Sequence, residues 1–346
     1  MTKGFALVGL GFGQWVLKDF LTGAKADPFF KLQAVCDLDL DLAKRVAAEY
    51  GVRAESSLDR LLRDSTIEVI GLFTGPTGRA ALIRKIVAAG RHVMTTKPFE
   101  TDPAAADVLE LAKERGCVVM MNSPQRPECR VDLTAISEWQ VEFSLGEPIA
   151  VHSEVWASYC EKADGGWQDD PRTCPAAPLF RLSIYAINDL ISLFGKVESV
   201  GVLTARRFTD RPTPDNACAQ MKFLNGMLAS FTSSFCVDDT EPYQSSLILH
   251  FQRGTIYRNM MRAVRGTPSK GVSLNLVCSQ GGERRLAQME IPISIGEYPW
   301  EVLYQAIAQK SQSFMPDTEV VAEGLRVIDA IRRSEQSGHT ERVMRG

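Results

Sequence analysis

Three closely spaced glycines near the start of the chain could bind a phosphate group. The apolar run Phe5–Val8 is typical of a buried strand, and a helical pattern begins soon after it. Between them stand Gly9, Gly11 and Gly13, which would allow a tight turn and a close approach of a diphosphate to the start of the helix. In the usual G-x-G-x-x-G spacing the third position is Gln14, so a glycine turn without a ligand stays an alternative.

A carboxylate follows the second strand-like run. Asp37 comes directly after Leu32–Cys36, where it could accept hydrogen bonds from the ribose of a dinucleotide and would repel a 2′-phosphate. This favours NAD over NADP as the cofactor. Asp37 and Asp39 could instead cap the helix that follows, and Lys44 and Arg45 leave NADP open.

A lysine stands at the end of a later strand-like run. Lys97 follows His92–Thr95 and precedes Pro98, and ligands of doubly wound sheets bind at the carboxyl ends of strands. A lysine there could exchange a proton with a substrate hydroxyl during hydride transfer, if burial or positive charge lowers its pKa. An ordinary solvated lysine is the alternative.

These residues need a parallel sheet to position them, and residues 1–123 predict one. Strand-like runs at 5–9, 32–36, 69–73, 92–95 and 118–121 alternate with helical patterns at 15–20, 40–50, 78–89 and 102–115. Such alternation is typical of an α/β Rossmann domain, a doubly wound parallel sheet with helices on both faces. Pro124 and Pro127 interrupt the pattern, so the first domain is expected to end at residue 123.

Residues 124–346 predict a second α/β domain with a large, mainly antiparallel sheet. Helical patterns cover 131–144, 179–194, 300–312 and 318–336, and strand-like runs cover 150–156, 197–206, 218–224, 227–235, 246–251, 255–258 and 274–278. Asn225–Gly226 between two of these runs is a strong hairpin signal.

Composition excludes several classes of function. The 346 residues suggest two domains, and 39 Lys+Arg against 42 Asp+Glu give a net charge of −3, without the basic excess of a nucleic-acid binder. No apolar run approaches the ~18 residues of a membrane span, and no leader pattern is present, so we expect a cytoplasmic protein. The eight cysteines and four histidines are dispersed, which predicts neither disulfides nor a metal site.

Together these residues resemble the Gfo/Idh/MocA oxidoreductases, a family that includes glucose-fructose oxidoreductase and inositol dehydrogenases. The resemblance extends over nearly the whole chain. It rests on Val8–Gly11, Val35–Asp37, Ala48–Val52, Gly90–Val93, Lys97–Pro98, Gly166–Trp167, Phe223–Gly226 and the tail Ile328–Val343. It implies NAD(P)-dependent hydride transfer to or from a sugar, cyclitol or related molecule, in a homodimer or homotetramer formed through the second domain's open sheet.

The resemblance also implies roles for individual residues. Lys97 and Tyr185 would share proton transfer, and a helix would place Arg181, Tyr185 and Asn188 on one face, although a core-packing tyrosine is an alternative. Contacts to substrate are implied for Arg181, Asn188, Arg126 and Trp167. Contacts to the cofactor are implied for Gly9, Gly11, Phe12, Gly13, Gln14, Asp37, Thr74, Gly75, Pro76, Arg79, Thr96, Lys97 and Pro98.

Three positions depart from the family's pattern. Thr96 stands in place of Glu, Arg79 in place of His and Arg181 in place of Asp. Arg181 would either lower the pKa of Lys97 or clamp an anionic substrate group. Because of these departures, three other functions stay open: a non-catalytic dinucleotide sensor or scaffold, an NAD-retaining glycoside hydrolase or lyase, and hydride transfer to an imine or enone.

Overall fold

The chain forms two compact units, which are described one at a time. The computed structural model describes residues 2–22, 28–238, 243–259, 271–292 and 295–345. Unit 1 comprises Met1–Glu100, Ala104–Cys129 and Tyr298–Glu319, and unit 2 comprises Thr101–Pro103, Arg130–Glu297 and Val320–Gly346. A domain boundary between residues 123 and 124 stays a prediction, but the segment 298–319, expected in the second domain, is part of unit 1. No helix in the described part of the chain is long and apolar enough to cross a membrane.

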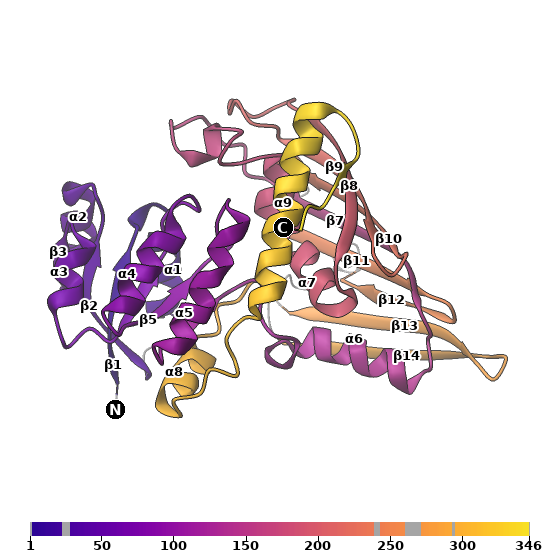
Figure 1. The fold of residues 1–346 in the computed structure, drawn as a ribbon, viewed down its shortest axis with the longest axis horizontal. Helices are drawn as coiled ribbons and strands as arrows, with labels where there is room; N and C mark the ends of the chain where they lie inside the picture. Colours follow the sequence, from indigo (N-terminus) through magenta and orange to yellow (C-terminus); the bar gives the residue numbers. More distant parts are fainter. Residues whose placement is uncertain (1, 23–27, 239–242, 260–270, 293–294, 346) are drawn as a thin grey trace. The chain divides into compact units, whose positions relative to one another are not determined.

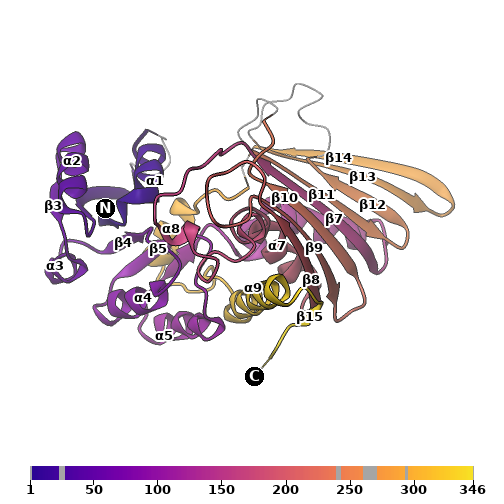
Figure 2. The same cartoon turned by 90° about the horizontal axis from the view of Figure 1, so that it is seen from above.

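Unit 1 contains a six-stranded, all-parallel sheet in the order β3-β2-β1-β4-β5-β6. Its strands are β1 (Lys3–Val8), β2 (Phe30–Cys36), β3 (Arg53–Glu55), β4 (Val69–Leu72), β5 (His92–Thr95) and β6 (Val119–Met121). Its helices are α1 (Leu10–Thr22), α2 (Leu40–Tyr50), α3 (Leu58–Arg63), α4 (Arg79–Ala88), α5 (Val108–Glu114) and α8 (Trp300–Ala308). Figure 2 shows α4 and α5 on one face of the sheet and α1 on the other. The predicted Rossmann-like sheet is confirmed.

The strand order reverses between β1 and β4, which are neighbours in the sheet. At such a switch point the loops after the two strands run in opposite directions, and a crevice for ligands opens at their carboxyl ends. The loops that follow β1 and β4 are therefore the expected binding site of unit 1.

Aromatic packing joins the late segment 298–319 to this sheet. The ring of Trp300 in α8 lies 5.5 Å from that of Phe5 and 5.9 Å from that of Phe30. Tyr304, one turn later, meets Phe30 at 6.1 Å. Aromatic contacts at these separations add to the free energy of burial, so α8 belongs to the core of unit 1.

Unit 2 contains a nine-stranded sheet in the order β14-β13-β12-β11-β7-β10-β9-β8-β15. The strands are β7 (Pro148–Ala157), β8 (Val197–Ala205), β9 (Asn216–Phe223), β10 (Leu228–Ser234), β11 (Tyr243–Phe251), β12 (Gly254–Arg258), β13 (Val272–Gln280), β14 (Glu283–Ile291) and β15 (Glu341–Arg342). Only β7 and β10 pair in parallel; the other described pairs are antiparallel. The mainly antiparallel sheet and the β9–β10 hairpin at Gly226 are thus confirmed.

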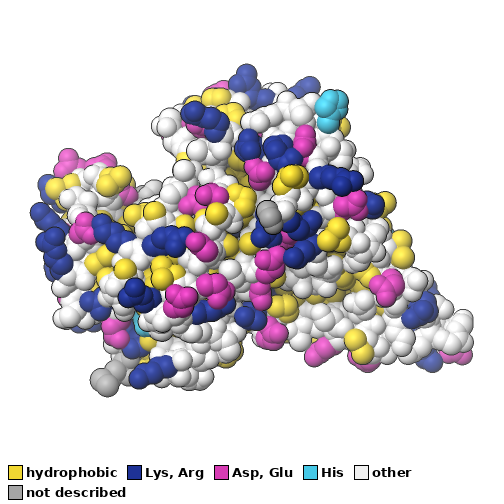
Figure 3. All heavy atoms as spheres, in the orientation of Figure 1, with side chains coloured by type: hydrophobic (Ala, Val, Ile, Leu, Met, Phe, Trp, Pro, Cys, Tyr) yellow, Lys and Arg dark blue, Asp and Glu magenta, His cyan; other side chains and the backbone are white. Residues whose placement is uncertain are grey.

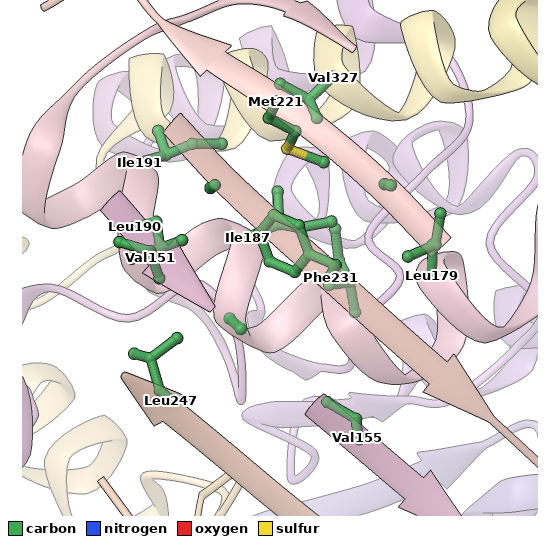
Figure 4. Close-up of a cluster of buried hydrophobic side chains, with 14 of the residues drawn as sticks. Val151, Val155, Leu179, Ile187, Leu190, Ile191, Met221, Phe231, Leu247 and Val327 are labelled. Atoms are coloured by element: carbon green, nitrogen blue, oxygen red, sulfur yellow. The ribbon is translucent and has the colours of Figure 1, made fainter. Parts of the chain in front are cut away.

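Helices α6 (Val131–Glu142), α7 (Ile184–Phe194) and α9 (Thr318–Ser337) cover one face of this sheet (Figure 1). Along β9 and much of β7, buried and more exposed residues alternate, as expected for a sheet with one covered face. Figure 4 shows part of the resulting core, where Ile187 of α7 and Val327 of α9 lie among Met221 and Phe231 of the strands.

Four charged side chains are buried together beneath this sheet. Arg130 forms two hydrogen bonds to Asp132, at 2.9 and 2.8 Å, and also pairs with Asp189. Arg258 of β12 donates to both carboxylates, at 3.1 and 2.8 Å. Burial alone would raise the pKa of Asp132, but the two arginines outweigh it and hold the pKa low. Two positive and two negative charges therefore compensate each other.

Neutralising Asp132 should destabilise the protein strongly. Asp132→Asn leaves two buried arginines with one carboxylate, and breaking a buried pair in this way costs about 3–5 kcal/mol. Urea unfolding should show a lower midpoint at an unchanged slope. Glu283→Gln, which removes an exposed partner of Arg285, serves as the control and should change little. Equal stability of the two variants would contradict the assignment.

A half-buried histidine stands in its neutral form at the start of β5. The Val118 amide donates to Nδ1 of His92 at 3.0 Å. Burial, assisted by the charge of Lys3, lowers the pKa of His92 to about 4 from an ordinary value of 6.5. The folded protein therefore binds fewer protons than the unfolded chain between these two pH values.

This histidine should make stability fall as the solution is acidified. Protonation favours the unfolded chain below about pH 6.5, so the free energy of unfolding should drop by about 2 kcal/mol between pH 7 and pH 5 from this residue. His92→Asn keeps an acceptor for Val118 but does not titrate. Urea unfolding of both proteins at the two pH values measures the difference, and parallel losses in both would refute a neutral, half-buried imidazole at His92.

The surface in view in Figure 3 carries lysines and arginines interspersed with aspartates and glutamates. This distribution agrees with the near balance of charges in the sequence.

Candidate functional site

Each of the three glycines of the first turn has a different structural surrounding, which explains what the absence of a Cβ does there. Gly9 has a φ of +87°, and a Cβ there would lie 2.8 Å from the Thr74 nitrogen in the loop after β4. A Cβ on Gly13 would lie 2.7 Å from Cδ2 of Leu7, so Gly13 brings α1 close to β1. A Cβ on Gly11 would meet nothing within 4 Å. Gly9 and Gly13 thus shape the turn, while Gly11 leaves the start of α1 open to an approaching group.

Asp37 links the end of β2 to this turn. Its Oδ2 accepts a hydrogen bond of 2.6 Å from the Leu10 amide, and its Oδ1 accepts one of 3.0 Å from the Asp39 amide. Asp39, by contrast, is the N-cap of α2 and accepts from Asp41 and Leu42. The carboxylate of Asp37 is therefore held beside the first amides of α1, and capping of α2 falls to Asp39.

The remaining residues predicted to contact a cofactor lie around the same edge of the sheet. Phe12 and Gln14 are exposed on the first turns of α1, Thr74 and Gly75 are half-buried in the loop after β4, and Pro76 and Pro98 are buried. Unit 1 thus gathers the predicted cofactor residues at the carboxyl ends of its strands.

Lys97 lies in the loop after β5, where side chains from two other segments bond its amide and the neighbouring Thr96 hydroxyl. The Lys97 amide donates to Oδ1 of Asn122, which follows β6, at 2.9 Å. The hydroxyl of Tyr298 donates to Oγ1 of Thr96 at 2.8 Å. The Lys97 side chain is half-buried, and the Lys97–Pro98 peptide bond is cis.

Arg79 does not have the role expected from the sequence. Its side chain is 1% exposed, and its guanidinium donates to the carbonyls of Thr96, Pro98, Phe99 and Thr74. Burial lowers the pKa of Arg79 to about 10, and Glu100 opposes this shift. A contact with a bound nucleotide would require these hydrogen bonds to break, so Arg79 is a structural residue beneath the loop.

Arg181 of unit 2 is also engaged within the protein. It lies in a π-helical turn, Leu179–Ser183, just before α7. Its two Nη atoms donate to the two oxygens of Glu161, at 2.5 and 2.6 Å, and its guanidinium lies 4.5 Å from the Phe235 ring centroid. Burial would raise the pKa of Glu161, but Arg181 and Arg211 lower it. Glu161 therefore occupies the fork that a substrate carboxylate would need, and a substrate clamp at Arg181 is not supported.

Arg181, Tyr185 and Asn188 contact different parts of unit 2. Arg181 is paired with Glu161, the Tyr185 ring packs against the backbone of Gly296, and the Asn188 amide lies against Gly324 of α9. The π turn has i→i+5 geometry, so the shared face expected for a regular α-helix does not follow from the spacing. Tyr185 is half-buried, whereas Asn188 is 4% exposed.

Trp167 and Arg126 have partners within their own units. The Trp167 ring meets that of Phe180 edge to face at 6.3 Å. Nε of Arg126 donates to the Met315 carbonyl at 2.7 Å, which ties the loop after β6 to the segment 298–319. A contact of either residue with substrate stays a prediction.

Four residues of these arrangements were not identified from the sequence: Asn122, Tyr298, Glu100 and Glu161. Asn122 stands directly after a strand-like run, as Asp37 does, and that position is a usable signal. Tyr298 reaches Thr96 across 202 residues, and Glu161 reaches Arg181 across 20 residues from an irregular segment. No local pattern indicates either contact.

The arrangement in unit 1 is suited to binding an anionic, ribose-containing ligand. A helix start open at Gly11 favours phosphate oxygens, and Asp37 offers acceptor oxygens at the end of the neighbouring strand. Lys97 provides an amino group on a fixed backbone one loop further along the sheet. Within the described residues, no group of three or more His, Cys, Asp or Glu is placed to hold a metal ion.

Residues 3–123 match the protein family described as an oxidoreductase family with an NAD-binding Rossmann fold, and residues 135–257 match the Gfo/Idh/MocA C-terminal domain. YhhX, an oxidoreductase of Escherichia coli, is 22% identical over 284 residues, covering 77% of this chain and 78% of that protein. UDP-N-acetylglucosamine 3-dehydrogenase of Acidithiobacillus ferrooxidans is 26% identical over 209 residues, 59% of each chain.

Two oxidoreductases of Schizosaccharomyces pombe are 25% and 29% identical over half of this chain, and the match spans only 45% of the length of each.

Solved structures have the same fold over their whole length. An oxidoreductase domain protein from Kribbella flavida has a TM-score of 0.78 at 16% identity, covering 99% of this chain and all of that one. Levoglucosan dehydrogenase in complex with NADH has a TM-score of 0.75 at 15% identity, covering all of both chains. With both family domains matched in order, the chain belongs to the Gfo/Idh/MocA oxidoreductases, with an NAD-binding Rossmann domain followed by the family's C-terminal domain.

Proposed function

We propose that the protein is an NAD(P)-dependent oxidoreductase that transfers a hydride between nicotinamide and a hydroxyl or carbonyl carbon of a sugar, cyclitol or related polyhydroxylated molecule. The observation that carries this proposal is the group of loops at the switch point of unit 1. There the turn at Gly9 meets Thr74, Asp37 is bonded to Leu10, and the Lys97 loop follows on the next strand.

The residues of unit 1 fit a dinucleotide. The amides at the start of α1, beside the open position at Gly11, would hold the pyrophosphate, and Asp37 would accept hydrogen bonds from the ribose hydroxyls. The loop around Thr74 and the segment from Thr96 would border the nicotinamide, which when bound supplies the carbon that accepts or releases hydride. We propose NAD as the preferred form because a 2′-phosphate would face the carboxylate of Asp37.

Lys97 is proposed to move the proton at the substrate oxygen. During oxidation its amine would take the hydroxyl proton, and during reduction its ammonium would return it. Tyr185 of unit 2 is proposed to share this transfer. A backbone held by Asn122 and a half-buried side chain are what such a group requires, since a catalytic amine must be fixed in place to act efficiently.

The proposed substrate is neutral. The bidentate pair of Arg181 with Glu161 leaves no net charge on these two side chains to attract an anion. Levoglucosan dehydrogenase acts on a sugar by its name, which supports a sugar-like molecule here.

We also propose that the exposed face of the sheet in unit 2 mediates a homo-oligomer. Leu203 is 78% exposed, Leu228 57% and Leu286 65%, and they lie on β8, β10 and β14. We place the contact on this face because it is the face of an open sheet that carries these exposed leucines.

Removing the amine of Lys97 should abolish most of the turnover. With NAD or NADP and a panel of neutral sugars, inositols and sugar acids, the wild type should change the absorbance of reduced nicotinamide, with neutral substrates preferred. Lys97→Ala should lower kcat by roughly 10²–10⁴-fold while dinucleotide affinity stays nearly unchanged. Lys85→Ala, which removes an exposed lysine of α4 paired with Asp59, is the matched control.

The same assay separates the other functions. Unaltered turnover by Lys97→Ala would refute the proton-transfer role. Dinucleotide binding without turnover of any substrate would point to a sensor or scaffold. Product formation without net reduced nicotinamide would point to a hydrolase or lyase that returns the hydride in each cycle.

Cofactor preference should respond to the charge of Asp37. Asp37→Asn keeps an acceptor for the Leu10 amide but removes the repulsion of a 2′-phosphate, so affinity for NADP relative to NAD should rise roughly 10-fold. Asp39→Asn removes an equal charge two residues away and should leave the ratio near that of the wild type. Calorimetric titration of both dinucleotides gives the four dissociation constants; identical ratios in the two variants would argue against a ribose contact at Asp37.

A further inference from the structure

A buried guanidinium lies beneath the loop that carries Lys97. We propose that Arg79 is a positioning residue for Lys97: it holds the backbone on both sides of the lysine and ties that loop to the end of β4, so that the amine is presented at a fixed place. This inference rests on the proposed catalytic role of Lys97. The proposal assigns a function to Arg79, an arginine at a position where the family resemblance leads us to expect a histidine.

The hydrogen bonds of Arg79 surround Lys97 in the sequence. Nη1 donates to the Thr96 carbonyl at 2.6 Å, to the Phe99 carbonyl at 3.1 Å and to the Pro98 carbonyl between them. Nη2 donates to the Thr74 carbonyl. One side chain thus connects the loop after β4, which meets Gly9, with the loop after β5.

Other side chains hold the same segment at different atoms. Asn122 accepts the Lys97 amide, and Tyr298 donates to the Thr96 hydroxyl. Together with Arg79 they engage the carbonyl of Thr96, its hydroxyl and the next amide. The Thr96 carbonyl and the Lys97 amide are therefore both bonded, which holds the backbone immediately before Lys97 at two points.

Arginine suits this position because its two Nη nitrogens reach carbonyls of both loops, while its buried Nε has no hydrogen-bond partner among the described residues. Its planar guanidinium carries five donors in a rigid arrangement, and charge-assisted hydrogen bonds are about twice as strong as neutral ones. A lysine has one nitrogen and cannot span the carbonyls of Thr74 and Phe99 in the same way. Only a side chain with several spaced donors can tie both loops together.

The charge of Arg79 is balanced by a second buried group. Glu100 is 4% exposed, and its two oxygens accept the amides of Gly78 and Ala80 at the start of α4, each at 3.1 Å. Glu100 therefore fixes the helix start on either side of Arg79 in the sequence. The loop, the guanidinium and the first turn of α4 form one connected arrangement.

Substitutions of Arg79 should change turnover more than binding. A displacement of about 1 Å at a reacting group can cost roughly 10²-fold in rate, so Arg79→Met should lower kcat roughly 10- to 100-fold. KM and dinucleotide affinity should stay within about threefold. Arg79→Lys, which keeps the charge without the fork, should recover only part of kcat. Arg84→Met removes an arginine of the same helix that pairs with Asp107 and should behave as the wild type.

Hydrogen exchange provides a readout that does not depend on turnover. In Arg79→Lys the Lys97 amide should exchange at least about 10-fold faster than in the wild type, while the strands of unit 1 keep their protection. The exchange rate of the Lys97 amide in Arg79→Lys tests the positioning role even if Arg79→Met does not fold or the substrate panel yields no activity.

Three results would overturn the positioning role. The first is an Arg79→Lys variant with wild-type kcat and wild-type exchange at Lys97. The second is a loss of dinucleotide affinity in Arg79→Met that accounts for its loss of rate, since Arg79 would then act on the cofactor. The third is a normal kcat for Arg79→Met when Lys97→Ala is inactive. Inactivity of the wild type on every substrate would instead count against the proposed function.

Discussion

The close approach of two backbone loops in unit 1 is the constraint on which the candidate site depends. The turn after β1 and the loop after β4 are so close that a single Cβ on Gly9 would collide with the Thr74 nitrogen. This approach follows from the order of the parallel sheet, in which β1 and β4 are neighbours although three helices and two strands separate them in the chain. Asp37 then bonds to one of these loops and Arg79 to the other.

Charged side chains are buried in both units, but different groups stabilise the buried charges in each. Beneath the sheet of unit 2, two arginines face two aspartates, so charge is balanced by charge. Beneath the Lys97 loop, the guanidinium of Arg79 is surrounded mainly by carbonyl oxygens, with Glu100 bonded to amides nearby. The first arrangement joins two helices to a strand. The second organises a loop, because backbone carbonyls are the groups it engages.

Much of the fold could be predicted because periodicity and burial agree. The helix Leu40–Tyr50 and the strand His92–Thr95 were predicted with the bounds found in the structure. Strand β3 has three residues, and β14 is a largely exposed, polar edge strand, so neither has the apolar alternation that indicates a strand. The first turn of the helix predicted from Leu179 is a π turn, a backbone choice that apolar spacing does not indicate.

The sequence by itself determined where the chemically competent groups fall: the glycines after the first strand, Asp37 after the second and Lys97 after a later one. These positions are local, since strand ends and turns are read from neighbouring residues. Only the tertiary structure decided what the arginines do. Arg181 and Arg79 are both plausible ligands for an anion until folding brings Glu161 to one and four carbonyls to the other. Their partners come from other elements or loops of the chain, and no short-range pattern encodes such a meeting.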